Sequence, residues 1–384
     1  MSAELLGALK ASQNNLLARL RGLSEEDGYK QYCDDLSPVA WHVGHCAFVE
    51  EYWIREIIHG DASTTEPLKD LYFPELSPKS LRAERLPPYS DMLDFATGLF
   101  TQHLQQLEEL TQSDHLHPLL RDAYLIRFLL QHSLQHQETV VQSLYLRALQ
   151  TDWGYQTHKI LAAKNYSAKH SEFNASDSKY GNHIVAEAYD NERPITQRAL
   201  AAFKIGTRSV NNAEYLGFME SGGYASQSFW SPEGRQWLQK ESVGNPAHWR
   251  RDRNNNWIAI TENGAEDLQP NDAVYGLNRY EAEAFANFAG GRLPHEFEWE
   301  HAATPQTSIT KQAWDWCGNA FFPYPNYTAY PYDGYSQPWF DGNHYTLRGG
   351  SRHTGKLIRR TTFRNFYTPE KRHVFAGVRV AFDP

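Results

Sequence analysis

Cysteine is scarce in this sequence of 384 residues, and its spacing excludes two kinds of protein. Cys33, Cys46 and Cys317 are far apart, odd in number and form no CxxC pair, so they indicate neither a disulfide framework nor a thiolate zinc site. No apolar run reaches membrane-spanning length, and the first residues lack the unbroken apolar core of a signal peptide. We therefore expect a cytoplasmic protein without a membrane partner.

Positive charge is also in short supply. The 37 Lys and Arg residues are outnumbered by 46 Asp and Glu residues, the net charge is -9, and no basic run creates a local exception. This balance gives no general attraction to nucleic acid, so we expect small-molecule partners. We expect a monomer or a weak homo-oligomer. The length of the chain predicts two domains.

Apolar residues recur at helical spacing in the first part of the chain, from residue 1 to about 150, which predicts a helical bundle. The four stretches are residues 5–20, 38–58 with Pro38 near the first turn, 90–110 with Ser90 as N-cap, and 122–149. The long connection at roughly 60–89 should lie at one end of the bundle.

The rest of the chain has a different character. Residues 151–195 are polar and without pattern, which predicts a linker. Residues 196–384 contain short apolar pieces broken by Gly, Pro and Asn, with one clear helix at 278–289 closed by Gly290 and Gly291. The chain as a whole is therefore predicted to be α+β, with a turn-rich second domain.

Two histidines interrupt the apolar helix at 122–149. His132 and His136 are four residues apart, so their imidazoles lie on one helix face at a metal-ligand spacing. His42 and His45 are three apart on the helix at 38–58, and a facing helix could bring one of them to the same point. The alternative is that these side chains only pack and form hydrogen bonds.

The donor type leaves the metal open. Three neutral imidazoles on one side of a redox metal suit a mononuclear iron oxidant, whereas zinc with a bound water suits the same ligands. Glu50, Glu51 or Glu138 could instead serve as a carboxylate ligand or orient the imidazoles.

Several short motifs, taken in order, make a resemblance to known families specific. The N-terminal half resembles the DinB-type helical bundle, the C-terminal half resembles the formylglycine-generating-enzyme domain, a C-type-lectin-like fold, and their fusion resembles the ergothioneine-biosynthesis sulfoxide synthases. The matching pieces are SPVAWHVGH, HSLQHQE, YDNERP, FKIGTRSVNNAEYLGF, SGGY, GGRLPHEFEWEHAA, WDW, PYDGY, LRGGS, FRN and FAGVRVAFD.

The resemblance implies an iron(II) site. The matching positions for its three histidine ligands are His45, His132 and His136, and Gln135 matches a position that contacts the histidine-derived substrate. Ser133 stands where the family usually has Glu, which we expect to alter the surroundings of the ligands rather than the metal.

In this family dioxygen is used to join sulfur to the imidazole ring carbon of hercynine, the Nα-trimethylated histidine, and a tyrosine of the C-terminal domain assists. Tyr332 and Tyr335 match by spacing, with Tyr332 predicted to be catalytic and Tyr335 to bind substrate; otherwise both rings only pack in an aromatic loop. Phe366 and Tyr367 are candidates for binding the quaternary ammonium by cation–π attraction, and Asn365 for binding the carboxylate.

The donor of the sulfur is less clearly indicated. Arg82 and Arg85 resemble arginines that hold the carboxylates of a thiol co-substrate, but Tyr367 stands where glutamylcysteine-using members have an acidic residue. Cysteine, or a selenosugar as in the similar selenoneine synthases, is then the alternative, and the rings of Trp339, Phe340 and Tyr367 would suit a sugar.

A DinB-type metal-dependent thiol transferase is a further alternative for the function of the chain. A non-catalytic binding module is another. Formylglycine generation needs a cysteine pair near RGGS, and the sequence has none there.

Overall fold

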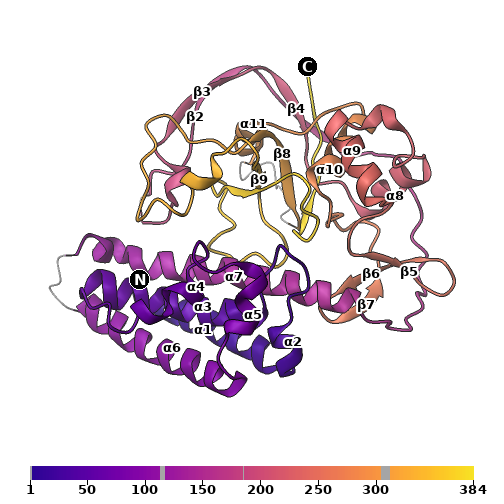
Figure 1. Cartoon of the computed structure of the whole chain (residues 1–384). Helices are drawn as coiled ribbons and strands as arrows, with labels where there is room; N and C mark the ends of the chain where they lie inside the picture. The colour runs from indigo at the N-terminus through magenta and orange to yellow at the C-terminus, as the bar shows by residue number, and fades with distance from the viewer. Residues whose placement is uncertain (1, 113–116, 185, 304–311) are drawn as a thin grey trace. The chain divides into compact units, whose positions relative to one another are not determined.

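The computed structural model describes residues 2–112, 117–184, 186–303 and 312–384 (Figure 1). The chain divides into two compact units: unit one is Met1–Gln150 with His353–Ile358, and unit two is Thr151–Arg352 with Arg359–Pro384. Unit one is helical and unit two combines sheets with helices, so the predicted α+β class is confirmed.

Unit one is a four-helix bundle. Its long helices α1, α3, α6 and α7 pack so that α1 contacts α6 and α7, and α3 contacts the same two helices. The predicted connection at 60–89 holds two short helices, α4 and α5. The bounds are α1 Ser2–Arg21, α2 Glu25–Tyr29, α3 Val39–Glu51, α4 Lys69–Tyr72, α5 Arg82–Arg85, α6 Tyr89–Gln112 and α7 Tyr124–Leu149.

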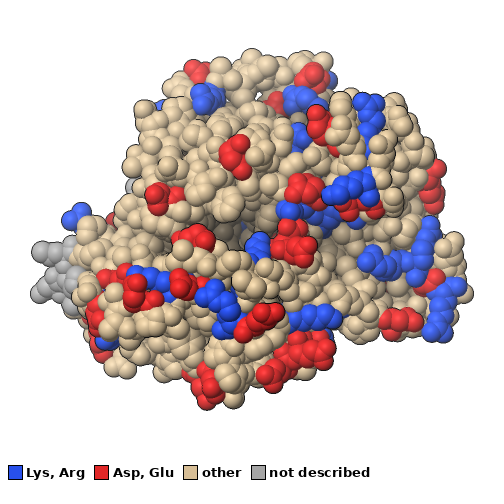
Figure 2. Space-filling model, in the orientation of Figure 1, with Lys and Arg blue, Asp and Glu red and all other residues tan. Residues whose placement is uncertain are grey.

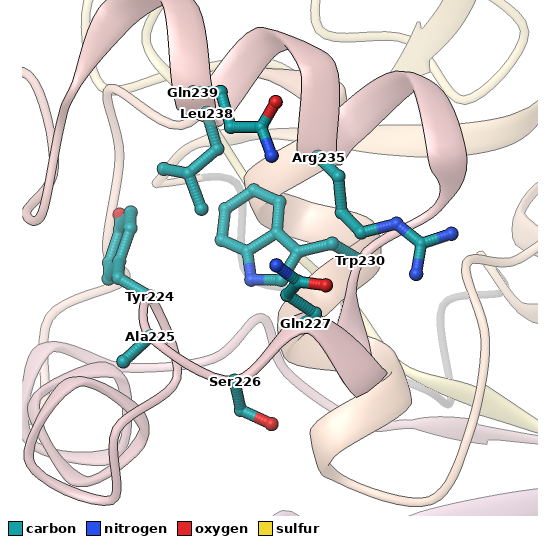
Figure 3. A pocket seen from close by; sticks show the side chains of 8 residues that line it. All are labelled: Tyr224, Ala225, Ser226, Gln227, Trp230, Arg235, Leu238 and Gln239. Atoms are coloured by element: carbon teal, nitrogen blue, oxygen red, sulfur yellow. The ribbon is translucent and has the colours of Figure 1, made fainter.

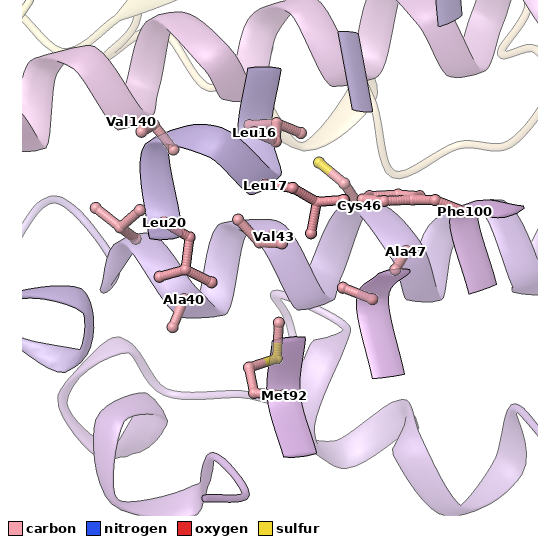
Figure 4. Close-up of a cluster of buried hydrophobic side chains, with 12 residues drawn as sticks. Leu16, Leu17, Leu20, Ala40, Val43, Cys46, Ala47, Met92, Phe100 and Val140 are labelled. Carbon is pink, nitrogen blue, oxygen red and sulfur yellow. The ribbon is translucent and has the colours of Figure 1, made fainter. Parts of the chain in front are cut away.

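Helix α3 lies at the centre of the bundle. All of its residues are buried, and it continues into a π-helical turn, Tyr52–Ile58. Figure 4 shows side chains of the four long helices meeting in one apolar cluster that includes Leu17, Val43 and Phe100. The prediction of Ser90 as an N-cap was wrong by two residues, since α6 begins at Tyr89 and Ser90 is its second residue.

A late segment of the chain completes unit one. Thr354 Oγ1 donates a hydrogen bond to Glu138 of α7 at 2.6 Å, and Tyr145 Oη lies 3.0 Å from His353 Nε2. A Cβ on Gly355 would lie 2.7 Å from the Leu134 side chain, so the backbone there packs directly on α7. The bundle is therefore not made from a contiguous part of the sequence.

The described residues of unit two form four small sheets. Their strand orders are β1-β4-β12, β10-β9-β8-β11, β2-β3 and β5-β6-β7, and neighbours are antiparallel except for β8 and β11. The bounds are β1 His170–Phe173, β2 Ser176–Tyr180, β3 Thr196–Leu200, β4 Phe203–Gly206, α8 Asn212–Glu220, α9 Pro232–Glu241, β5 Trp249–Arg251, β6 Trp257–Thr261, β7 Gly264–Asp267, α10 Arg279–Phe288, α11 Glu296–Ala302, β8 Trp314–Ala320, β9 Tyr345–Arg348, β10 Asn365–Tyr367, β11 Ala376–Gly377 and β12 Ala381–Phe382.

The stretch predicted as a linker differs from that expectation, because residues 170–180 form β1 and β2 and pair with β4 and β3. The predicted helix at 278–289 is α10, which Asn278 caps by accepting a hydrogen bond from Glu281 N. Gly290 follows with a φ of +75°, the left-handed conformation that glycine adopts without strain.

Buried ion pairs hold the C-terminal motifs of unit two together. Arg364 of FRN binds Glu296 through two hydrogen bonds of 2.7 and 2.8 Å and also donates to the main chain at Asn191 and Phe322. Arg379 donates to Asp315 at 2.8 Å. These motif arginines are fully buried, so they serve the framework.

Charged side chains are mixed at the surface. In Figure 2, Lys and Arg side chains are interspersed with Asp and Glu over most of the displayed face. Within the described ranges, none of the helices combines the length and the apolar character needed to cross a membrane.

Candidate metal centre

Three imidazoles converge inside unit one. His45 of α3 lies opposite His132 and His136 of α7, and one ligand atom from each lies within 4.8 Å of the others. The Nε2 atoms of His45 and His132 are 3.1 Å apart, and the three ring centroids are separated by 4.5 to 5.0 Å. The structure thus brings together the three histidines that the sequence analysis selected.

The orientation of His45 is fixed on both sides of its ring. Its Nδ1 lies 2.7 Å from the main-chain oxygen of Tyr72, which accepts the Nδ1 hydrogen and leaves Nε2 as the free ligand atom. The ring also stacks on Trp41, with centroids 4.7 Å apart and an interplanar angle of 11°. The approach of Tyr72 requires Gly44, because a Cβ there would lie 2.5 Å from the Tyr72 hydroxyl.

The site favours neutral imidazoles. Burial, followed by the neighbouring histidines, holds the pKa of His45 and that of His136 well below the ordinary value, and burial lowers the pKa of His132 to about 4. Neutral imidazoles are the form that binds a metal ion. The donor set, its burial and the anchored Nδ1 of His45 therefore fit a metal ion held by three histidines.

A fourth imidazole lies against the cluster. His42 is buried on α3, and its Nδ1 is 2.9 Å from Nδ1 of His136. Burial, together with the charges of Arg82 and Lys79, lowers the pKa of His42 to about 3. The spacing of His42 and His45 did not distinguish them in the sequence, and in the structure both contact α7: His45 lies 3.1 Å from His132 and His42 lies 2.9 Å from His136.

The carboxylates considered as ligands have other partners. Glu50 and Glu51 lie 3.1 and 2.8 Å from the two ring nitrogens of buried His103. Glu138 accepts from Thr354. Ser133 lies 2.7 Å from Ser12 of α1, so it contacts the bundle interior rather than the ligand rings.

Arg82, predicted to bind a substrate carboxylate, has several partners within unit one. Its guanidinium is buried and donates to the Ser77 oxygen at 2.9 Å, to Ser37 Oγ at 2.5 Å and to the Pro74 oxygen at 3.2 Å. The same group lies 3.7 Å above the Trp41 ring, so Arg82 backs the ring that stacks on His45. Arg85 is exposed and keeps the predicted role as a hypothesis.

Gln135 is half-buried on α7, between His132 and His136 in sequence, and its Nε2 lies 3.4 Å from the Gln131 oxygen. This places it on the helix that carries two of the three histidines.

The remaining predicted residues lie in unit two. Tyr332 is 41% exposed, and a Cβ on Gly334 would meet its ring at 2.8 Å. Tyr335 stacks on Tyr189 with centroids 4.1 Å apart, and its ring also meets Phe366 edge-on at 6.3 Å. In the PYDGY loop, the Tyr332 ring therefore packs close to Gly334, and the Tyr335 ring packs on other aromatic rings.

Strand β10 carries the other predicted substrate residues. Asn365, Phe366 and Tyr367 pair with β9 and are each half-buried. Phe366 stacks on Phe321 at 4.4 Å and lies 6.1 Å from Trp339, which is 40% exposed.

A cavity of about 240 Å³ lies elsewhere in unit two and contains none of the predicted site residues. Figure 3 shows the Trp230 indole among the side chains of Tyr224, Gln227, Leu238 and Gln239. The cavity is separate from the aromatic residues of β10.

Two family models match the chain, one within each of the two units. Residues 8–140 match the DinB superfamily, and residues 173–311 match the sulfatase-modifying factor enzyme 1-like domain. The hercynine oxygenase of Mycolicibacterium thermoresistibile is 28% identical over 99% of this chain and 95% of its own length. The two matched domains and this relative support an ergothioneine-biosynthesis sulfoxide synthase-like family for the chain.

Two other relatives match less of the chain and less of their own length. The hercynine oxygenase of Mycobacterium tuberculosis is 28% identical over 92% of this chain and 92% of its own length. Ergothioneine biosynthesis protein 1 of Schizosaccharomyces pombe is 23% identical over 50% of this chain and 27% of that protein. These relatives support an enzyme, and the three converging histidines form a possible metal site.

Proposed function

We propose that this chain is a non-heme iron(II), dioxygen-dependent synthase that forms a carbon–sulfur bond at the imidazole ring carbon of hercynine. The observation that carries the proposal is the convergence of His45, which is buried, with His132 and His136, which are half-buried, in a chain that aligns over nearly its full length with a hercynine oxygenase. Iron(II) bound by these three imidazoles would supply the oxidising chemistry with dioxygen.

The chain's own residues have the following proposed roles. Gln135, on the helix of two ligands, hydrogen-bonds the substrate imidazole. The exposed Tyr332 phenol donates a proton at its Oη, and Tyr335, Phe366 and Tyr367 bind the quaternary ammonium through their rings. Asn365 binds the substrate carboxylate.

The proposed reaction balances in two ways. With a thiol R–SH, loss of the ring hydrogen and the thiol hydrogen, with transfer of one oxygen atom to sulfur, gives the sulfoxide and one water from one dioxygen. Without transfer of oxygen to sulfur, the same two hydrogens leave with dioxygen as hydrogen peroxide. The two products differ by the mass of one oxygen atom.

A second candidate is the selenoneine synthase reaction, with a selenosugar as the donor. Trp339 favours it, since this ring is 40% exposed beside Phe366, and exposed aromatic rings suit the apolar face of a sugar. Tyr367, a neutral residue where glutamylcysteine-using members carry an acid, also supports a donor without a free ammonium.

The test uses the full chain loaded anaerobically with iron(II) and supplied with hercynine and oxygen. Cysteine, glutamylcysteine and a selenosugar are offered in parallel, and the products are weighed. A single sulfur or selenium adduct supports the synthase and names the donor. His136→Ala should abolish both iron and product, whereas the exposed control His158→Ala should keep both.

Product formation from a thiol without oxygen, on zinc as well as on iron, would replace this proposal with the thiol transferase alternative. Binding of hercynine with no adduct from any donor would favour a binding protein. Tyr332→Phe should bind iron normally and lose most of the turnover, while Tyr335→Leu, which removes the ring, should mainly raise the KM for hercynine.

A further inference from the structure

His42 is the buried histidine that the three-ligand assignment does not use. It is 5% exposed, its ring centroid is 5.1 Å from that of His136, and the two Nδ1 atoms are 2.9 Å apart. Among the residues that the structure describes, His42 Nε2 has no hydrogen-bond partner. A buried polar atom without a partner is costly and requires an explanation.

The contact between the two Nδ1 atoms allows only one hydrogen. If His42 carries it, neutral His136 must hold its own hydrogen on Nε2 and cannot offer that atom to a metal. If His136 carries it, His42 accepts, and His136 Nε2 becomes a free lone pair. The second arrangement leaves a hydrogen on His42 Nε2, the atom without a partner.

We propose that His42 is a positioning residue of the metal centre: its Nδ1 accepts the Nδ1 hydrogen of His136 and so presents His136 Nε2 as the ligand atom. Ligand histidines usually donate their second ring hydrogen to a carboxylate, a carbonyl or a water. Here a neutral imidazole takes that place for His136, as the Tyr72 carbonyl does for His45.

This assignment explains why no carboxylate is needed beside these two ligands. Glu50 and Glu51 are bound to His103, and Glu138 is bound to Thr354. With neutral acceptors behind His45 and His136, the full positive charge of the ion remains available to an anionic ligand such as a thiolate or selenolate. The inference rests on the proposed function only in requiring that the cluster holds a metal.

Two variants of the full chain test the role. In His42→Asn the side-chain oxygen can replace Nδ1 as acceptor, whereas His42→Leu removes the acceptor and also the unpartnered Nε2. We expect His42→Leu to weaken binding of cobalt(II) or iron(II), measured anaerobically against a chelator, by about 10- to 100-fold and to shift the cobalt(II) visible spectrum. His42→Asn should stay within about 3-fold of the parent, with an unchanged spectrum.

Stability separates positioning from a structural role. His42→Leu removes the unpartnered Nε2 but leaves His136 Nδ1 without its acceptor, so its thermal midpoint without metal should stay close to that of the parent, although its metal affinity falls. Nitrogen-15 NMR of the zinc-loaded protein should place the shared hydrogen on His136 Nδ1. Equal metal affinity in His42→Leu, or a hydrogen on His42 Nδ1, overturns the proposal.

Other outcomes are also decisive. If His42→Asn loses metal as completely as His136→Ala, His42 is a ligand and the positioning role is wrong. If affinity depends on His42 as expected but hercynine gives no adduct, the proposed function fails and this inference stands. If adducts form and His42→Leu binds metal normally, only this inference fails.

Discussion

Nδ1 of His45 lies 2.7 Å from the main-chain oxygen of Tyr72, the last residue of α4. Carbonyls at the end of a helix have no partner within it, so this oxygen is free to accept from a side chain. The short helix α4 thereby sets the orientation of a proposed metal ligand on α3. Helix α4 belongs to the connection at roughly 60–89, for which the sequence predicted only a position at one end of the bundle.

Gly44→Ala should disturb this contact. The new Cβ would lie 2.5 to 2.7 Å from the Tyr72 hydroxyl and ring, and Tyr72 is buried between Phe48 and Phe95, so it cannot move away freely. We expect a loss of about 1–3 kcal/mol in the free energy of unfolding and a weaker metal complex, measured by urea titration and chelator competition.

The matched control for Gly44→Ala is Gly98→Ala, at an exposed position of α6 where a Cβ would have no atom within 4 Å. Alanine is the better helix former, so this variant should gain about 0.5–1 kcal/mol. Equal effects of the two substitutions would contradict the role of the Gly44–Tyr72 contact.

Arg82→Lys should destabilise the protein by about 2–4 kcal/mol, because lysine cannot reproduce three hydrogen bonds and the stacking on Trp41. Arg85→Lys, on the exposed side of the same helix, should change stability by less than about 0.5 kcal/mol. Urea titration of both variants decides the matter. A normal stability of Arg82→Lys with a raised KM for the donor would restore the substrate role.

The metal-free protein should lose stability as the pH falls below 6.5. The folded pKa values of His42 and His132, about 3 and about 4, lie below the ordinary value of 6.5, so the unfolded chain takes up protons first. Between those values each imidazole contributes a slope of up to about 1.4 kcal/mol per pH unit. Urea titrations of the parent and of His132→Gln check this, since the variant should show a shallower slope.

The contribution of His103 to stability should have the opposite pH dependence, falling as the pH rises. Burial lowers its pKa, but the hydrogen bonds and charges of Glu50 and Glu51 raise the pKa by more, so the net shift is upward. Its contribution to stability is complete below the ordinary value of 6.5 and is lost as the pH rises through the higher folded value. His103→Gln should therefore lower the thermal midpoint more at about pH 6 than at about pH 9, and equal losses would refute this.

Sequence reasoning reached the helices and the cluster of three histidines for identifiable reasons. Residues four apart on a helix must share a face, which made His132 and His136 a pair, and the apolar spacing of the four long helices is strong. The choice of His45 over His42 came from the family resemblance, and which of them faces His132 depends on how α3 is rotated against α7.

Other features could not be read from the sequence, for equally physical reasons. Arg82 stands in a polar stretch, and no local pattern reports that Trp41 lies beneath its guanidinium. Strands β1 and β2 are half-exposed and polar, so they lack the apolar alternation by which a strand is recognised. The network of Glu50, Glu51 and His103 joins helices that are distant in sequence, and only packing could bring these groups together.

The return of residues 353–358 to the bundle has a consequence for how the protein is made. Thr354 bonds to Glu138, 216 positions earlier, and Gly355 packs on Leu134 between the two histidines of α7. A ribosome therefore releases the helix that carries His132 and His136 long before it releases the segment that covers it. During that interval Leu134 lacks its contact with Gly355. A fragment that ends at residue 150 would lack residues 353–358, which are part of the bundle.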